Sequence, residues 1–333
     1  MILVSGATGM VGSHVLFACA QKNLPLIALY RREESVRKIE QLFKTLAPKH
    51  PEYFSRIRWE QVELNDIIGL DSLFKHVKQV YHCAAKISFA QFQQEKLNKT
   101  NIEGTANMVN LALKYQVDKF AYVSSIAALG VEQTIPLVNE DHHWNSDQNH
   151  TTYAHSKYGA ELEVWRASQE GLNVVIVNPG LILGSHFWER SSGTLIRRIA
   201  KGLRFYPIGS VGIVALEDVV NPLILLMESN FKNERFILVS ENLKYKDLLG
   251  KIAKSLDKKP PKFPLTKGLL YTLYVLDKIL YALGIKKSFL SQAFVQSLCS
   301  DQKYDGSKIE KKLAFSYQDT KTTLEKISKD YKA

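Results

Sequence analysis

The feature that most constrains this chain is a glycine-spaced turn between an apolar strand and a helix. Residues 1–4 predict a short buried strand, and Gly6, Gly9 and Gly12 follow at the spacing G-x-x-G-x-x-G before the helical periodicity of residues 13–22. A bend this tight needs residues without a Cβ. A diphosphate over the new helix needs unshielded backbone N–H groups and the positive end of the helix dipole. We therefore predict a nucleotide-binding turn, with a ligand-free glycine loop as the alternative.

Composition limits the classes of partner. The chain has 333 residues, which suits one large domain or two modest ones, and its 45% hydrophobic content supports a sizeable core. The formal net charge of +11 favours an anionic ligand such as a phosphorylated cofactor. Because the basic residues are scattered rather than collected in one run, we expect a solvated surface and no nucleic-acid partner.

Cysteine spacing and hydropathy predict neither a disulfide framework nor a membrane-spanning helix. Cys19, Cys83 and Cys299 are too few and too far apart for a disulfide framework, and no C-x-x-C pair suggests a metal site. Basic residues do not precede the first apolar stretch, so we expect no signal peptide. Since no run of about 18 uncharged apolar residues occurs, we expect no membrane-spanning helix and a cytoplasmic location.

Apolar strands alternate with helical segments through the first 184 residues. This alternation predicts a parallel sheet covered on both faces. We predict an α/β fold with a Rossmann-type doubly wound sheet in residues 1–184. Residues 185–333 would form a smaller, mostly helical substrate lobe, some elements of which can return to the first domain. Beyond the first strand, the expected sheet strands are 26–30, 56–64, 80–84, 119–124 and 173–177.

The residues after the second strand bear on the choice of cofactor. An acidic residue there would accept hydrogen bonds from an adenine ribose, but this chain has Tyr30, Arg31 and Arg32. A guanidinium offers a planar set of donors to a phosphate. Glu33 and Glu34 fit better as first-turn residues of the next helix. We predict NADP(H) in preference to NAD(H); plain surface arginines are the alternative.

Other strand ends supply further cofactor contacts, because ligands of such sheets bind at the carboxyl ends of strands. A carboxylate after the third strand could hold the adenine edge, and small residues after the fourth let the backbone pass close to the cofactor. His82 is expected to be structural, with catalysis as the alternative. The predicted cofactor-binding residues are Gly6, Thr8, Gly9, Met10, Val11, Gly12, Tyr30, Arg31, Arg32, Glu63, Leu64, Cys83, Ala84, Ala85, Lys157, Pro179 and Gly180.

Tyr153 and Lys157 lie four residues apart, which places them on one face of a helix. A phenol with a pKa near 10 is a poor base, and we expect the nearby ammonium to lower that pKa. Ser125, at the end of the fifth strand, can donate to a substrate carbonyl oxygen. Asn101 could complete a relay through its backbone or a water. A chance Y-x-x-x-K pair is the alternative.

Together these motifs resemble the extended short-chain dehydrogenase/reductase family over nearly the full length. By resemblance, Tyr153 is the proton donor or acceptor, Lys157 its partner, Ser125 the polariser and Asn101 the fourth catalytic member. Ser5 replaces the usual Thr and keeps its hydroxyl. Glu63 replaces the usual Asp, so the adenine contact is less firmly implied than the other matches. The matching segments are Gly6/Gly9/Gly12, His82-Cys-Ala-Ala85, Asn101 with Gly104-Thr105, Ser124-Ser125, Tyr153-x-x-x-Lys157 and Pro179-Gly180.

The sequence also separates branches of that family. Sugar dehydratases carry Asp-Glu after the catalytic Ser or Thr, whereas Ile126 and Ala127 follow Ser125 here. Nucleotide-sugar epimerases place an Asn where this chain has Leu181. Residues 153–161 and 177–184 resemble the dihydroflavonol reductase and hydroxysteroid dehydrogenase branch.

These observations predict an NADP(H)-preferring oxidoreductase that interconverts a carbonyl and an alcohol. Phe187, Trp188, Phe205 and Tyr206 suggest a bulky, fairly hydrophobic small-molecule substrate, with packing of the lobe as the alternative reading. Rival functions are a nucleotide-sugar epimerase with tightly bound NAD and a cofactor-bound sensor or scaffold. The resemblance also implies a homodimer through the helices near 91–115 and 153–169.

A helix predicted over about 265–283 is apolar, with Lys267 and Lys278 near its ends. Such a helix can lie on a membrane surface. We expect it instead to be buried against the neighbouring lobe.

Overall fold

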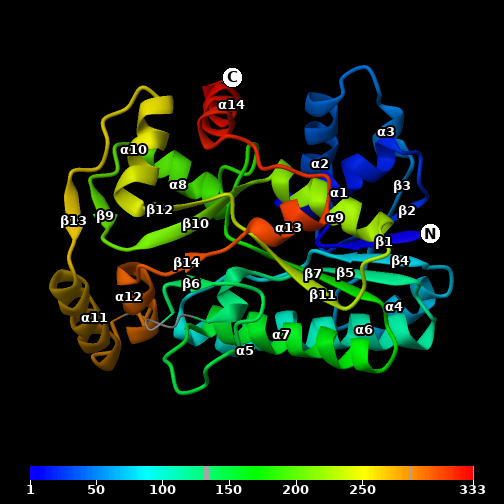
Figure 1. Ribbon diagram of the computed structural model, residues 1–333, viewed down its shortest axis with the longest axis horizontal. Coiled ribbons are helices and arrows are strands. Elements are labelled where there is room, and N and C mark those ends of the chain that lie inside the picture. The colour runs from blue at the N-terminus through cyan, green and yellow to red at the C-terminus, as the bar shows by residue number, and fades with distance from the viewer. Residues whose placement is uncertain (131–134, 286, 333) are drawn as a thin grey trace.

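A computed structural model describes residues 1–130, 135–285 and 287–332. Within these residues the central sheet has seven parallel strands in the order β11-β7-β5-β4-β1-β2-β3 (Figure 1). The order reverses between β1 and β4, so the sheet is doubly wound, as the sequence predicts. The strands are β1 (Ile2–Ser5), β2 (Leu26–Tyr30), β3 (Ile57–Gln61), β4 (Gln79–His82), β5 (Lys119–Val123), β7 (Val174–Pro179) and β11 (Glu234–Leu238).

Helices cover both faces of this sheet (Figure 1). Side chains alternate along β5: Ala121 and Val123 join one core cluster, and Phe120 and Tyr122 join the other. The first cluster is closed by α1 (Met10–Gln21), α2 (Glu33–Leu46) and α9 (Glu217–Glu228). The second is closed by α4 (Ile67–Phe74), α6 (Gly104–Lys114) and α7 (Thr152–Gln169).

Two elements from beyond residue 184 belong to this core. Strand β11 pairs in parallel with β7, with Phe236 opposite Val177. Helix α9 packs on α1, β5 and β7. The chain therefore leaves the sheet after β7, builds part of the second lobe and returns to complete the sheet edge.

The long helix predicted over 91–115 is broken into pieces. It comprises a 3-10 turn (Gln91–Gln93), α5 (Gln94–Asn98), a π-helical turn (Lys99–Glu103) and α6. The π turn inserts one extra residue into the helical register and is frequent at functional sites. It contains Asn101, which is buried.

The second lobe combines helices with short strands that the sequence analysis did not predict. Strands β8 (Leu181–Leu183), β10 (Ser210–Ala215) and β12 (Glu241–Lys244) form a three-stranded sheet. The core cluster of the lobe includes residues of α8 (Ser191–Ala200), α10 (Tyr245–Ser255) and α14 (Thr320–Lys332). The remaining elements are α3 (Glu52–Ser55), η3 (Ile126–Leu129), β6 (Leu137–Val138), β9 (Phe205–Pro207), β13 (Phe263–Leu265), α12 (Gln292–Cys299), β14 (Lys303–Tyr304) and α13 (Ser307–Lys312).

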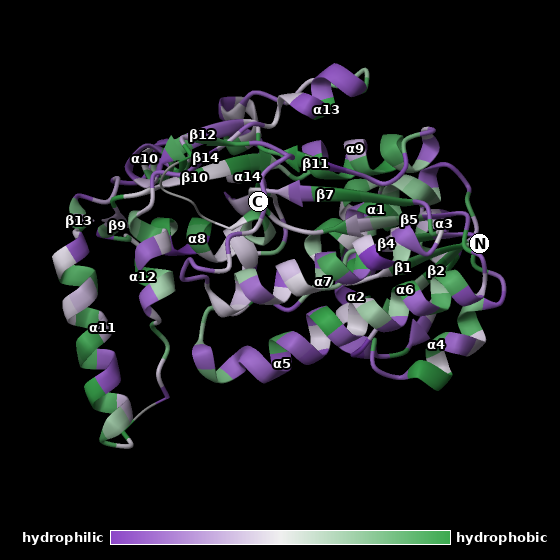
Figure 2. Ribbon diagram, turned by 60° about the horizontal axis from the view of Figure 1, so that its bottom comes forward, coloured by the Kyte–Doolittle hydropathy of each residue, from purple (hydrophilic) through white to green (hydrophobic). Residues whose placement is uncertain are grey.

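Helix α11 (Lys267–Ala282) contradicts the expectation of burial against the lobe. It lies at the edge of the molecule (Figure 2), and Leu270 and Asp277 are its buried residues. The side chains of Leu273, Leu276 and Ile279 are exposed. The sequence showed that this helix is apolar, but it could not show whether another element covers it. Among the described residues, no helix is both long enough and apolar enough to cross a bilayer.

Candidate active site

The glycine turn connects β1 to α1 and packs against the residues that follow β4. Gly6 has φ +65°, and a Cβ there would lie 2.6 Å from the backbone nitrogen of Ala84. A Cβ on Gly12 would lie 2.3 Å from the carbonyl oxygen of Gly6. Both contacts are far below van der Waals distance. Glycine is therefore required at both positions by local packing, independently of any ligand.

The start of α1 nevertheless suits an anion. Its N-cap residue, Gly9, provides no side-chain cap, and the first turn carries no acidic residue. The first-turn N–H groups are therefore available to the diphosphate of a dinucleotide. Met10 and Val11 are buried in the core, so only their backbone can face such a ligand. The loop and helix thus fit the cofactor that the sequence predicts.

The second strand ends in the two arginines that were predicted to hold a phosphate. Arg31 and Arg32 are exposed, and neither takes part in an ion pair among the described residues. Glu33 and Glu34 lie in the first turn of α2, as predicted. Glu34 pairs with Lys38 at 3.0 Å rather than with either arginine. Both guanidinium groups are therefore free to meet an anion at this edge of the sheet.

The remaining predicted cofactor residues occupy strand ends in different ways. Glu63 is exposed, whereas Leu64 packs on Gly104, whose added Cβ would lie 2.9 Å from the Leu64 side chain. Gly180 lies against the backbone of β10, because a Cβ there would be 2.4 Å from the carbonyl oxygen of Gly212. Gly180 follows β7 directly, and its close approach to β10 accounts for this glycine. Ala85 is exposed and Pro179 is buried. The predicted residues that are half-buried are Thr8, Tyr30, Cys83 and Ala84.

His82 is structural, as expected. Its Nδ1 lies 2.6 Å from the Ser5 hydroxyl and its Nε2 lies 2.9 Å from the Thr105 hydroxyl. Thr105 donates its only proton to the carbonyl oxygen of Asn101, so it must accept from Nε2–H of His82. Burial lowers the pKa of His82 to about 3, which leaves Nδ1 to accept from Ser5. This chain of bonds ties the glycine turn to the π turn.

The Asn101 side chain holds the loop after β4. Its Oδ1 accepts from the backbone N–H of Lys86 at 2.7 Å, and its Nδ2 donates to the Lys86 carbonyl at 3.0 Å. Nδ2 also donates to the Ser156 hydroxyl at 2.9 Å. The amide is therefore fully engaged within the protein, so any relay through Asn101 would have to use its backbone.

Tyr153 and Ser125 meet at the end of β5. Thr151 caps α7 by accepting from the Ala154 N–H at 3.1 Å, which sets Tyr153 in the first turn. Burial raises the pKa of Tyr153 to about 12, and a hydrogen bond with the Ser125 side chain partly offsets that rise. The ring contacts Phe89, with centroids 5.6 Å apart. A protonated phenol thus stands beside a hydroxyl and an aromatic wall.

Lys157 is buried below this pair and faces the sheet. Its Nζ donates to the Tyr122 hydroxyl at 2.7 Å and to the Val123 carbonyl at 2.9 Å. Burial lowers the pKa of Lys157 to about 7. The expectation that Lys157 lowers the pKa of Tyr153 is therefore wrong for this structure. Burial dominates at both groups, and the ammonium is directed at Tyr122.

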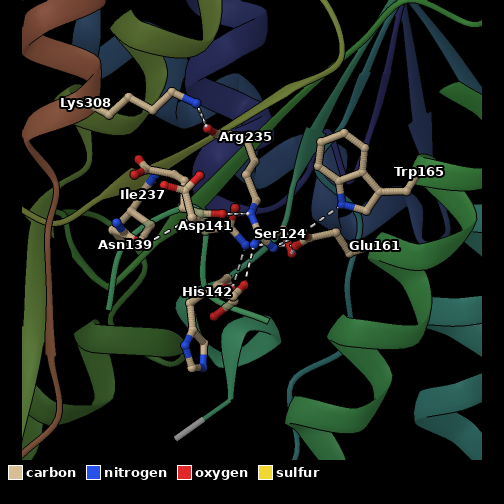
Figure 3. A network of polar contacts seen from close by, with 12 residues as sticks. Ser124, Asn139, Asp141, His142, Glu161, Trp165, Arg235, Ile237 and Lys308 are labelled. Atoms are coloured by element: carbon tan, nitrogen blue, oxygen red, sulfur yellow. Dashed lines mark hydrogen bonds and ion pairs between the residues drawn. The ribbon is translucent and has the colours of Figure 1, made fainter. Parts of the chain in front are cut away.

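Glu161 was not predicted to have a role. It lies one turn beyond Lys157 and is buried, and Figure 3 shows it in a polar network with Ser124, Trp165 and Arg235. Its Oε2 accepts from Ser124 at 2.6 Å and from Asn178 at 2.8 Å. Its Oε1 is 3.3 Å from Arg235. The i, i+4 spacing from Lys157 was visible in the sequence, but the partners from other segments lie directly after β5, in β7 and in β11.

The predicted substrate aromatics mostly pack within the protein. Trp188 and Tyr206 join the core of the second lobe, and Phe187 packs against the sheet core. The alternative, lobe packing, therefore describes Trp188 and Tyr206, whereas Phe205 is exposed and its ring lies against Phe263. The aromatic side chains beside Tyr153 are instead Phe89 and, stacked on it with centroids 4.8 Å apart, Phe294 of α12.

Known proteins share the sequence pattern and the fold of this chain. The profile of the NAD dependent epimerase/dehydratase family matches residues 2–237. The Synechocystis sp. protein named "Putative dihydroflavonol 4-reductase" is 26% identical over 331 residues, covering 96% of this chain and 91% of its own. The sterol demethylase protein B of Methylococcus capsulatus is 26% identical over 244 residues, which cover 72% of this chain and 70% of that protein.

A solved structure with a similar fold covers the whole chain. The crystal structure of gox2253 superposes with a TM-score of 0.83 at 25% identity, covering 100% of this chain and 98% of its own. The chain therefore belongs to the NAD dependent epimerase/dehydratase family, and it is an NAD(P)-dependent reductase or dehydrogenase of the extended short-chain type.

Proposed function

We propose that this enzyme is an NADP(H)-preferring oxidoreductase that interconverts a carbonyl and an alcohol on a bulky, hydrophobic small molecule. The observation that carries the proposal is the Tyr153–Ser125 pair, set at the end of β5 beside a buried lysine. The bound cofactor supplies or takes the hydride at the carbonyl carbon. The side chains of this protein hold the carbonyl oxygen and exchange its proton.

The protonation states favour reduction. With its pKa near 12, Tyr153 carries its proton at neutral pH and can give it to the oxygen as the alcohol forms. Ser125 donates a hydrogen bond that polarises the carbonyl. In the reverse direction Tyr153 would have to lose its proton first, which its raised pKa opposes. A charged Lys157 would ease that loss.

Two observations support the choice of cofactor and substrate class. Arg31 and Arg32 are exposed and outside the ion pairs of the described residues, so they can pair with the ribose phosphate of NADP(H). Phe89 and Phe294 give the site an aromatic wall, which suits a bulky apolar substrate. A relative named for sterol demethylation is consistent with that class.

The proposal is tested by Tyr153→Phe. Aromatic ketones, steroids and aldehydes are first screened by following NADPH absorbance with the parent enzyme. We expect Tyr153→Phe to lower kcat by roughly 100-fold or more on the substrate found, because it removes the proton donor. The thermal shift produced by NADPH should remain. Tyr158→Phe, on the same helix and stacked on Trp144, is the matched control and should keep its activity. Turnover of Tyr153→Phe within about tenfold of the parent would exclude the role of Tyr153.

A further inference from the structure

Helix α11 attaches to the body of the protein along one side. Leu270 and Asp277 are buried there. Oδ2 of Asp277 accepts from the Ser288 hydroxyl at 2.8 Å and from the backbone N–H groups of Phe289 and Leu290 at 3.1 Å. This carboxylate fixes the segment that returns from α11 to α12. We call residues 263–285 and 287–289 the α11 arm.

The opposite side of the arm is an exposed apolar stripe. Leu269, Leu273, Leu276, Ile279 and Leu283 follow one another at spacings of three or four residues, so they share one face of the helix. Their exposed fractions run from 41% to 67%. Phe263 precedes the helix and Phe289 follows it, and each is more than half exposed. A continuous apolar stripe of this kind marks an interaction surface.

The positive charge around α11 indicates an anionic partner. Although the basic residues form no single run, their excess is not evenly scattered as the sequence analysis expected. Residues 258–287 hold seven lysines and one aspartate, so they carry six of the chain's eleven net positive charges. The aspartate is the buried Asp277, and Lys286 lies outside the described residues. Exposed lysines lie before α11 at 258, 259 and 262 and at its first residue, 267. None of these four takes part in an ion pair among the described residues.

We propose that the α11 arm docks on an anionic lipid bilayer. An amphipathic helix with apolar residues on one face and lysines at its ends lies in the interface between headgroups and acyl chains. Anionic lipids attract the lysines. A second copy of this chain fits less well, because pairing the same face would bring two strongly positive segments together.

The arm is also continuous with the candidate active site. The Phe289 ring contacts Phe92, with centroids 5.4 Å apart. Phe294 of α12, the helix that packs on α11, stacks on Phe89, which in turn contacts Tyr153. Resting on the proposed function, this continuity means that a membrane-dissolved substrate would approach the site along aromatic side chains. Docking itself does not depend on it.

Sedimentation of the full-length protein with vesicles tests the proposal. Vesicles of phosphatidylcholine alone are compared with vesicles containing about 30 mol% phosphatidylglycerol, at low salt and at about 0.5 M NaCl. We expect binding to the anionic vesicles that falls at least about tenfold at high salt. Leu276→Glu/Ile279→Glu should reduce binding at least about tenfold, because it charges the face that enters the bilayer.

Matched controls separate docking from general effects. Ile67→Glu/Ile68→Glu adds two charges at exposed apolar positions on α4 and should bind as the parent does. Replacing lysines 258, 259, 262 and 267 by Ala should lower binding to anionic vesicles more than replacing exposed lysines 49, 75, 201 and 232. Circular dichroism and thermal midpoints check that each variant folds.

Three outcomes would overturn the proposal. The parent protein could stay in the supernatant with anionic vesicles. Leu276→Glu/Ile279→Glu could bind as well as the parent. Sedimentation velocity without lipid could instead show self-association that this variant abolishes, which would assign the face to a second copy. Since no readout here uses catalysis, failure of docking is distinguishable from failure of the proposed reaction.

Discussion

Burial governs the chemistry of the Lys157 side chain. Its neighbours on the sheet, the Tyr122 hydroxyl and the Val123 carbonyl, satisfy two of its three donors. The pKa still falls from its ordinary value to about 7, since desolvation outweighs the attraction of Glu161. The folded protein therefore loses this proton near pH 7, whereas the unfolded chain keeps it to about pH 10.4.

This difference predicts a pH-dependent stability. Between about pH 7 and pH 10.4 the unfolded state binds more protons at Lys157, so the contribution of this residue to the free energy of unfolding rises with pH. Below pH 7 the buried charge costs about 5 kcal/mol relative to the neutral amine. We expect Lys157→Met to gain stability relative to the parent at pH 6.5 and to lose most of that gain by pH 9.5. Urea unfolding of the parent and of Lys157→Met at both pH values measures this difference in the free energy of unfolding.

Lys75→Met is the matched control, because Lys75 is exposed at the end of α4. Its stability relative to the parent should be the same at both pH values. A stability difference for Lys157→Met that does not change with pH would show that Lys157 keeps its proton across this range.

At the scale of elements, helix α7 positions three side chains at intervals of about one helical turn. Tyr153 reaches the end of β5, Lys157 faces Tyr122, and Glu161 binds Ser124, Asn178 and Arg235. Glu161 thereby connects α7 to the residue after β5, to β7 and to β11. Ser124 is adjacent to Ser125, so this carboxylate is a positioning residue for the strand end that carries Ser125.

Glu161→Gln should disturb this positioning. An amide turns an N–H₂ toward groups that donate, and it leaves the Arg235 guanidinium without its carboxylate. We expect a loss of about 3 kcal/mol in the free energy of unfolding. The pKa of Lys157 should also fall, because the Glu161 charge raises it. Urea unfolding and the pH profile of kcat measure the two effects.

Glu163→Gln is the control on the same helix, since Glu163 makes a surface pair with Arg166 at 3.0 Å. We expect a change within about 0.5 kcal/mol. Equal effects of the two substitutions would mean that the Glu161 network contributes no more than a surface pair.

Some elements were placed closely from the sequence, whereas the single helix expected over 91–115 is interrupted by the π turn and several short strands were not predicted. Predicted helix 153–169 is observed as Thr152–Gln169, and predicted strand 26–30 as Leu26–Tyr30. Strands β8 and β12 have three and four residues, and unlike the four-residue β1 they are not followed by a recognisable motif such as the glycine turn. They exist because β10 offers both a backbone partner.

At the scale of the whole molecule, cofactor binding should be visible as a gain in stability. A ligand that binds only the folded state at about 100 times its Kd stabilises it by about 2.7 kcal/mol. If the arginines hold a ribose phosphate, NADPH should raise Tm by several degrees more than NADH at the same concentration. Arg31→Ala/Arg32→Ala should remove that difference.

Arg56→Ala is the control for this measurement. Arg56 is exposed but precedes β3, at the opposite end of the strands from Arg31. Its NADPH shift should equal that of the parent. A larger thermal shift with NADH than with NADPH would contradict the preference for NADP(H).

The sequence by itself determined the doubly wound sheet and the glycine turn. It also placed Tyr153 and Lys157 on one helix and Ser125 at a strand end. These depend on local spacing and on alternation along one segment, which a linear chain displays directly. The tertiary structure alone decided where Lys157 points, which strands Glu161 connects and which face of α11 stays uncovered. Each of these depends on side chains from segments far apart in the chain, and burial changes their energies by more than local sequence does.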